Sequence, residues 1–194
     1  MLKTGKILAL LIVLAASIGS AAMSAAQASE RAWQALADGG IVLFRHALAP
    51  GTGDPRNFRL GDCSTQRNLN GQGRAEAQAI GKEFRQRGIR AGEVLTSQWC
   101  RCVETAELAF PGRVREAPVF NSFYANRTRG PRQTRQALEI LSAWQGPGAL
   151  VVVTHQVNIT ALTGIIPRSG EGIVVQVTGN DLAVVGRIPV PRAY

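Results

Sequence analysis

Residues 149–155 read ALVVVTH, and this stretch decides the fold. A continuous run of β-branched and small apolar residues is typical of a strand that is buried on both faces of a parallel sheet. The run ends at His155. A second apolar run, IVLFRH at residues 41–46, ends at His46, the other of the chain's two histidines.

Segments with helical periodicity alternate with these apolar runs, which is the pattern of an α/β fold. The expected strands are 41–45, 93–96, 116–120 and 149–155. The expected helices begin after Asn70, before Val103, after Gly130 and at Val157, and end near Gly88, Pro111, Trp144 and Ile165. Residues 172–178 and 182–188 alternate around Gly179-Asn180 and predict a hairpin. We therefore expect a three-layer sandwich with a largely parallel central sheet and a C-terminal hairpin.

The first 28 residues have the layout of a secretory signal peptide. Lys3 and Lys6 precede an apolar core, and Ala26-Gln27-Ala28 forms a small-x-small cleavage site. An uncleaved membrane anchor is the alternative, but the Ala, Ser and Gly of the second half favour cleavage. The expected product is one domain, residues 29–194, that is periplasmic or secreted and has no stable membrane insertion.

The charge of the chain indicates an anionic partner. Removing the two lysines of the signal lowers the formal net charge from +9 to +7, and almost all remaining basic residues are arginines. Arginine matches phosphate and carboxylate oxygens with a planar fork of donors. The arginines are scattered and no aromatic residues are interleaved with them, so we do not expect nucleic-acid binding.

Three cysteines, Cys63, Cys100 and Cys102, predict one disulfide and one spare thiol in an exported chain. Cys100 and Cys102 are too close in sequence to pair comfortably with each other, so Cys63 is expected to pair with one of them. A zinc site of three cysteines and one histidine is the competing interpretation, but the spacing matches no common zinc module.

Ligands of open α/β sheets bind beyond the carboxyl ends of the strands, where both histidines fall. The segment SQWCRCVETA, residues 97–106, follows another strand and places Arg101 at a helix start, which favours anions. Arg45, His46, Arg101 and His155 together predict a cradle for a phosphoryl group. The chain has no dinucleotide fingerprint and no metal-ligand spacing, so we expect no cofactor and no metal.

The order FRHA, SQWCRCVETA and VVVTHQ resembles the histidine phosphatase superfamily, which includes the phosphoglycerate mutases and histidine acid phosphatases. The family's Arg-His-Gly signature falls on Arg45, His46 and Ala47. Its second arginine falls on Arg101 in a frame with Ser97, Glu104, Thr105 and Ala106, and its second histidine falls on His155. The resemblance implies a phosphoglycerate mutase-like fold and a metal-independent phosphatase that forms a phosphohistidine on His46.

Two departures from the family pattern concern the site. Ala47 replaces a glycine, so we expect a narrower or slightly shifted pocket. Gln156 stands where one branch of the family has an aspartate that protonates the leaving group. We expect Glu171 to take over as proton donor, with Glu116 next, and Asp54 and Asp62 as more remote candidates.

The expected substrate is a small phosphomonoester, with a sugar phosphate or a lipopolysaccharide-type headgroup as the named candidates. Arg127, Arg129, Arg132 and Arg135 are expected to steer it towards the pocket. The alternative hypothesis is a catalytically weak phosphate-binding module of the same fold, because Ala47 and the missing acid both depart from the active pattern.

Overall fold

The computed structural model describes residues 27–179 and 181–190. Six strands form one mixed sheet in the order β3-β2-β4-β1-β5-β6. They are β1 (Ile41–Arg45), β2 (Ala91–Thr96), β3 (Val114–Glu116), β4 (Ala149–Thr154), β5 (Gly172–Thr178) and β6 (Asp181–Ile188). Strands β1 to β4 are parallel, and the hairpin β5–β6 is added antiparallel beside β1. The expected largely parallel sheet with a C-terminal hairpin is confirmed.

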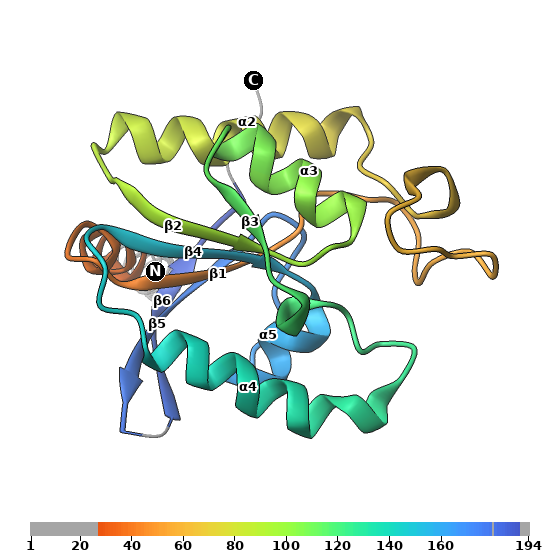
Figure 1. Cartoon of the computed structure of the whole chain (residues 1–194). Helices are drawn as coiled ribbons and strands as arrows, with labels where there is room; N and C mark the ends of the chain where they lie inside the picture. The colour runs from red at the N-terminus through yellow and green to blue at the C-terminus, as the bar shows by residue number, and fades with distance from the viewer. Residues whose placement is uncertain (1–26, 180, 191–194) are drawn as a thin grey trace, which may run out of the picture.

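Helices cover both faces of this sheet, so the expected three-layer arrangement is also confirmed (Figure 1). The helices are α2 (Gly71–Gln86), α3 (Cys100–Ala109), α4 (Gly130–Ser142) and α5 (Gln156–Thr163), with short 3₁₀ turns η1 (Cys63–Thr65), η2 (Pro118–Phe120) and η3 (Arg127–Arg129). Helices α2 and α3 lie on one face, and α4 and α5 lie on the other.

Strand β4 is buried along its whole length, as its sequence predicts. Val151 and Val153 pack into the core on the α2/α3 face, whereas Leu150 and Val152 pack into the core on the α4/α5 face. Because side chains alternate across a strand, the continuous apolar run supplies both cores at once.

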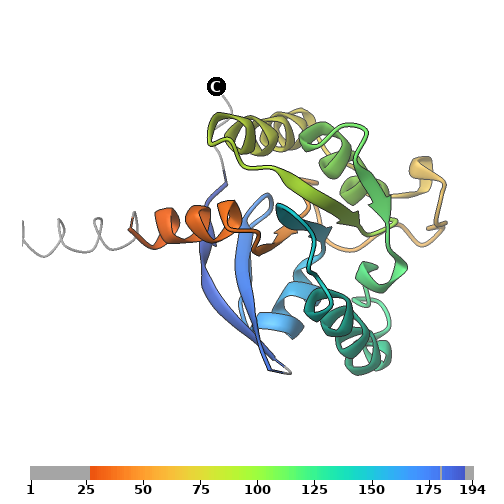
Figure 2. The same ribbon diagram turned by 60° about the vertical axis from the view of Figure 1, so that its left-hand side comes forward.

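Residues 27–37 form a further helix that was not expected from the sequence. Its Ala32, Trp33 and Leu36 are buried in the core on the α2/α3 face, and Trp33 contacts Phe84 edge to face at 5.4 Å. Figure 2 shows this helix, in orange, passing the hairpin, where a Cβ on Gly186 would lie 2.7 Å from a helix carbonyl oxygen. Glycine therefore permits the close approach.

Residues 1–26 of the expected signal peptide lie outside the described residues. Within the part of the chain that the structure describes, no helix combines the length and apolarity that a bilayer crossing requires.

Two local predictions were wrong. A strand was expected at 116–120, but the observed strand β3 ends at Glu116. Pro118 has no N–H to donate to the sheet, and it begins the 3₁₀ turn η2 instead. Ile140 was expected on the buried face of α4 with Ala137 and Leu141, but it is 38% exposed. Leu138 packs against the core in its place.

Candidate active site

The two histidines are brought together by the pairing of β1 with β4. Arg45, the last residue of β1, lies opposite Thr154, the last residue of β4. The next residue of each strand is a histidine, and the two imidazole centroids lie 5.6 Å apart. The expected convergence of the imidazoles at the carboxyl ends of neighbouring strands is therefore present in the structure.

The imidazole of His46 has a defined tautomer. Its Nδ1 lies 2.8 Å from the carbonyl oxygen of Ala47, which can only accept, so Nδ1 carries the proton and donates. The lone pair of Nε2 is left free. Burial, followed by the charge of Arg101, holds the pKa of His46 well below its usual value, although the bond to Ala47 opposes the shift. His46 is therefore neutral and nucleophilic at neutral pH.

His155 has the opposite tautomer. Nη2 of Arg101 lies 3.5 Å from its Nδ1, and a guanidinium can only donate, so Nδ1 accepts and Nε2 carries the proton. Nε2 donates to Ser97 Oγ at 2.8 Å. Burial first, and then the nearby imidazole of His46 and the charge of Arg101, hold the pKa of His155 well below its usual value.

Arg101 lies in the first turn of α3 and is only 3% exposed. Its Nη1 donates to Asp54 Oδ1 at 2.6 Å and to the carbonyl of Arg67 at 3.3 Å. Its Nη2 donates to Asp54 Oδ2 at 3.2 Å and to His155. The buried Nε of Arg101 has no hydrogen-bond partner among the residues that the structure describes. Arg101 is thus held from both sides and keeps one free donor.

Arg45 is fixed by the segment around α5. Its Nη1 donates to Gln156 Oε1 at 3.2 Å and to the carbonyl of Pro167 at 3.0 Å. Its buried Nε has no partner in the described part of the chain. Gln156, the residue after His155, therefore orients Arg45.

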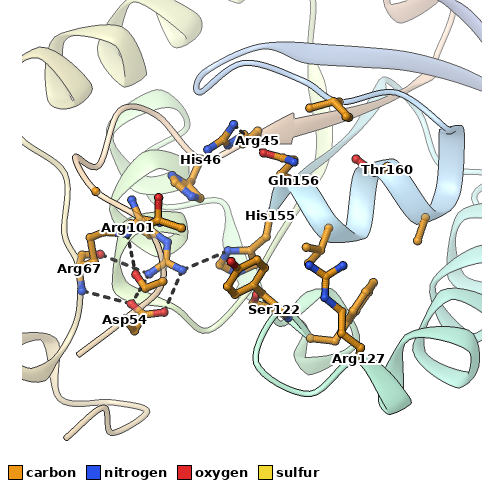
Figure 3. A pocket seen from close by; sticks show the side chains of 18 residues that line it. Arg45, His46, Asp54, Arg67, Arg101, Ser122, Arg127, His155, Gln156 and Thr160 are labelled. Carbon is orange, nitrogen blue, oxygen red and sulfur yellow. Dashed lines mark hydrogen bonds and ion pairs between the residues drawn. The ribbon is translucent and has the colours of Figure 1, made fainter. Parts of the chain in front are cut away.

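One cavity of about 550 Å³ joins these groups. All four residues predicted for the site, Arg45, His46, Arg101 and His155, line it (Figure 3). They form the inner end of the cavity, which we call the cradle.

Asp54 and Arg67 also line the cavity. Sequence reasoning named Asp54 only as a remote proton donor and did not name Arg67. Arg67 braces the loop after β1, since its Nε donates to the carbonyl of Gly53 at 2.8 Å and its Nη1 donates to that of Ala49. Its only signal in the sequence is its place in a loop rich in polar residues.

The carboxylate of Asp54 is held as an anion. Burial raises its pKa, but hydrogen bonds and charge from Arg101, together with a bond from Trp99 Nε1 at 3.0 Å, outweigh burial and leave the pKa below its usual value. Asp54 therefore does not offer a proton at neutral pH.

The carboxylates favoured as proton donors lie elsewhere. Glu171 pairs with Arg187 at 2.7 Å and accepts from the backbone N–H of Arg168, and it does not line the cavity. Glu116 accepts from Gln98 and is exposed, and Asp62 caps the turn η1. Glu171 was expected to reach the ligand, and this was wrong, because its carboxylate forms an ion pair with Arg187 instead.

Ala47 does not narrow the cavity. Its side chain is fully buried in a small cluster with Ala49, Leu69 and Ala77, and it is absent from the cavity wall. Within the described residues no residue other than glycine has a positive φ, so the turn accepts a Cβ without strain.

Two hydroxyls close to Arg101 in sequence, those of Ser97 and Thr105, form hydrogen bonds at the histidines. Ser97 accepts from His155, and its own hydroxyl donates to Asn121 Oδ1 at 3.2 Å. Thr105 Oγ1 accepts from the N–H of Ala47 at 3.1 Å and donates to the carbonyl of Arg101 at 2.6 Å. The hydroxyl of Ser97 thus holds the ring of His155, and the hydroxyl of Thr105 connects α3 with the backbone next to His46.

Cys63 and Cys100 form a disulfide, and Cys102 is a free, buried cysteine. The prediction of one bridge from Cys63 is confirmed, and the zinc interpretation loses two of its ligands. Burial raises the pKa of the Cys102 thiol to about 12. The disulfide fastens the loop that carries Asp54 and Arg67 to the first residue of α3, directly before Arg101.

The comparisons with known proteins concern the sequence family and the fold. The sequence model of the histidine phosphatase superfamily (branch 1) matches residues 41–120. No curated protein matches the chain.

Solved structures share the fold at low sequence identity. The putative phosphohistidine phosphatase SixA from Agrobacterium tumefaciens is 19% identical with a TM-score of 0.54, over 77% of this chain and 96% of that one. A putative α-ribazole-5'-P phosphatase from Escherichia coli is 16% identical with a TM-score of 0.53, over 75% and 94%. The chain is thus similar in sequence to the histidine phosphatase superfamily over residues 41–120, and it shares the fold of these solved structures.

Proposed function

We propose that this protein is a phosphatase that hydrolyses a small phosphomonoester through a phosphohistidine on His46. The observation that carries the proposal is the tautomer of His46, whose Nε2 lone pair is free in a cavity that it shares with Arg45, Arg101 and His155. A neutral imidazole held among guanidiniums is suited to attack phosphorus.

The reaction has two displacement steps. In the first, the Nε2 lone pair of His46 forms a bond to phosphorus while the bond from phosphorus to the leaving oxygen breaks. In the second, water attacks phosphorus, the P–N bond breaks, and orthophosphate and neutral His46 are released. Arg45 and Arg101 stabilise the charge on the phosphoryl oxygens, which supplies most of the catalysis in such transfers.

We assign the proton for the leaving oxygen to His155. No carboxylate in the cavity is free to donate, because Asp54 is held ionised by Arg101. A bound phosphate dianion favours protonation of a neighbouring imidazole, so His155 gains a proton on Nδ1 and keeps its bond to Ser97 through Nε2. Replacing His155 with Gln then slows an alkyl phosphate more than p-nitrophenyl phosphate, whose leaving group needs no proton. Equal slowing of both esters contradicts the assignment.

The function is tested with purified mature protein and p-nitrophenyl phosphate in the presence of a metal chelator. We expect turnover without metal in the native protein and none in His46→Ala, with circular dichroism showing that the variant is folded. Undiminished turnover in His46→Ala contradicts the proposal. Sugar phosphates and a lipopolysaccharide-type headgroup belong in the same substrate screen.

One observation favours a second function, a phosphate-binding module with little turnover. Asp54 already occupies Arg101 with two hydrogen bonds, and every other carboxylate that the sequence suggested lies outside the cavity. Calorimetric titration with orthophosphate beside a sensitive assay separates the two functions. Tight binding without turnover across a broad panel of phosphomonoesters supports the binding module.

We infer that the protein is exported to the periplasm or secreted. The signal-like sequence of residues 1–28 and a disulfide, which persists in oxidising compartments, support this inference. N-terminal sequencing of protein from a periplasmic fraction is expected to begin at Ser29. Recovery of the intact N-terminus from the cytoplasm contradicts it.

A further inference from the structure

The cavity has an outer half that differs in chemistry from the cradle. Beyond the histidines and arginines its wall is formed by apolar side chains from the loop after η2, from α5 and from the segment after α5. They are Phe123, Tyr124, Val157, Ala161 and Ile166. Figure 3 shows Arg127 and Thr160 on the side of the cavity away from Asp54 and Arg67.

Two of these side chains are large and remain exposed. Tyr124 is 49% exposed and Ile166 is 66% exposed, and they come from separate segments that meet at the same cavity. The Arg127 guanidinium lies 5.0 Å from the centroid of the Tyr124 ring, in a cation–π contact. Exposed apolar side chains that gather around a cavity mark a binding surface rather than chance exposure.

Three polar side chains of this wall each use one atom in a hydrogen bond within the described residues, and the guanidinium of Arg127 lies over the ring of Tyr124. Gln156 Oε1 accepts from Arg45, Thr160 Oγ1 donates to the carbonyl of Ile165, and Ser122 Oγ accepts from the N–H of Tyr124. The cavity exposes more apolar than polar surface, so burying an apolar group of a ligand against it is favourable.

We propose that the outer half of the cavity, lined by Tyr124 and Ile166, binds an apolar and preferably aromatic leaving group of the phosphomonoester. The cradle and the outer half belong to one cavity, so a phosphate bound in the cradle places its ester substituent in the outer half. This inference rests on the proposed phosphatase function and refines it: an aryl or similarly apolar phosphate is preferred to a sugar phosphate.

The test compares phenyl phosphate with 2-naphthyl phosphate, whose leaving groups have similar basicity but different apolar area. We expect kcat/KM to be about five- to tenfold higher for the naphthyl ester, from the burial of its second ring. A ratio near one in the native protein overturns the proposal.

Variants locate the effect in the wall. Tyr124→Ser and Ile166→Ser are expected to bring the naphthyl-to-phenyl ratio close to one. Ile140→Ser, a matched change at an exposed isoleucine on α4 that does not line the cavity, is expected to keep the native ratio. An unchanged ratio in both wall variants overturns the proposal. The inhibition constant for vanadate, which fills only the cradle, reveals any variant that has lost the whole site.

The failure of the subsite is distinct from the failure of the phosphatase function. If neither ester is turned over, the function is wrong, and calorimetry with 2-naphthyl phosphate against orthophosphate still tests the subsite. Tighter binding of the naphthyl ester supports the apolar wall, and equal binding overturns it.

Discussion

The two sides of the cradle are built by different means. Arg45, His46 and His155 come at the ends of β1 and β4, and the register of a parallel ladder fixes their positions. Asp54 and Arg67 come from the long loop after β1, whose position depends on the Cys63–Cys100 disulfide and on the ion pair with Arg101. The proposed nucleophile and its neighbours are therefore held by the sheet, whereas Asp54 and Arg67 are held by side-chain contacts.

Arg101 joins the two sides, and its replacement is expected to have the largest effect. Arg101→Lys loses the fork of donors that holds His155 and Asp54 together, so we expect kcat/KM to fall by about 10²–10³-fold. Steady-state assays with p-nitrophenyl phosphate measure the loss. Arg132→Lys, an exposed residue outside the cavity, is the control. A decrease in kcat/KM of less than threefold in Arg101→Lys would show that Arg101 does not stabilise the transition state.

Breaking the disulfide is expected to act mainly on the loop side. The bridge links residues separated by 37 positions, and its loss in a Cys63→Ser/Cys100→Ser variant lowers the free energy of unfolding by about 3–4 kcal/mol. Urea unfolding with and without reductant measures this change. The reductant should destabilise the native protein and leave the variant unchanged; equal responses contradict the prediction.

The sequence predicted the sheet side better than the loop side for physical reasons. Apolar runs, turn glycines and the Asn70 cap, whose side chain accepts from Gly73, are local signals that survive in the fold. The position of Asp54 depends on a residue 47 positions away in sequence, and no local pattern contains that contact.

The same limit explains the other misses. Glu171 was expected in the cavity because glycines flank it, but Arg187 on the neighbouring strand binds its carboxylate. The helix at residues 27–37 begins within the alanine-rich segment that resembles a cleavage region. The sequence around Trp33 therefore did not predict a helix or the burial of this side chain. Contacts that are distant in sequence decide these positions.

The two histidines and Asp54 are expected to affect the free energy of unfolding in different pH ranges. The pKa of each histidine is lowered on folding, so below about pH 6.5 the unfolded chain binds protons that the folded chain does not. The free energy of unfolding then falls as the pH decreases, by up to about 1.4 kcal/mol per pH unit for each histidine. The pKa of Asp54 is also lowered, but its stabilisation is lost only below about pH 4.

His155→Gln isolates one histidine in this window. We expect the slope of unfolding free energy between pH 6.5 and pH 5 to fall to about half, because the chain has only two histidines. Urea unfolding across this range measures the slope. A slope equal to that of the native protein contradicts a neutral, buried His155.

Removing the charge of Asp54 is expected to have a smaller effect than the three changes above, and it should strengthen the binding of phosphate rather than weaken the protein. The carboxylate competes with phosphate for Arg101 and repels it, so Asp54→Asn should bind orthophosphate about tenfold more tightly. Calorimetry measures the affinity, with Asp62→Asn on the same loop as the control. Weaker binding in Asp54→Asn would show instead that the carboxylate positions Arg101 for the ligand.

Trapping of the phosphoenzyme tests the central claim, that His46 accepts the phosphoryl group on Nε2, most directly. The protein is mixed with an aryl phosphate, quenched in alkali, where phosphohistidine is stable, and digested for peptide mass spectrometry. The account predicts an acid-labile phosphoryl group on the peptide that contains His46, and none in His46→Ala. Steady turnover with the phosphoryl group on any other residue, or with no trapped phosphoenzyme, would contradict it.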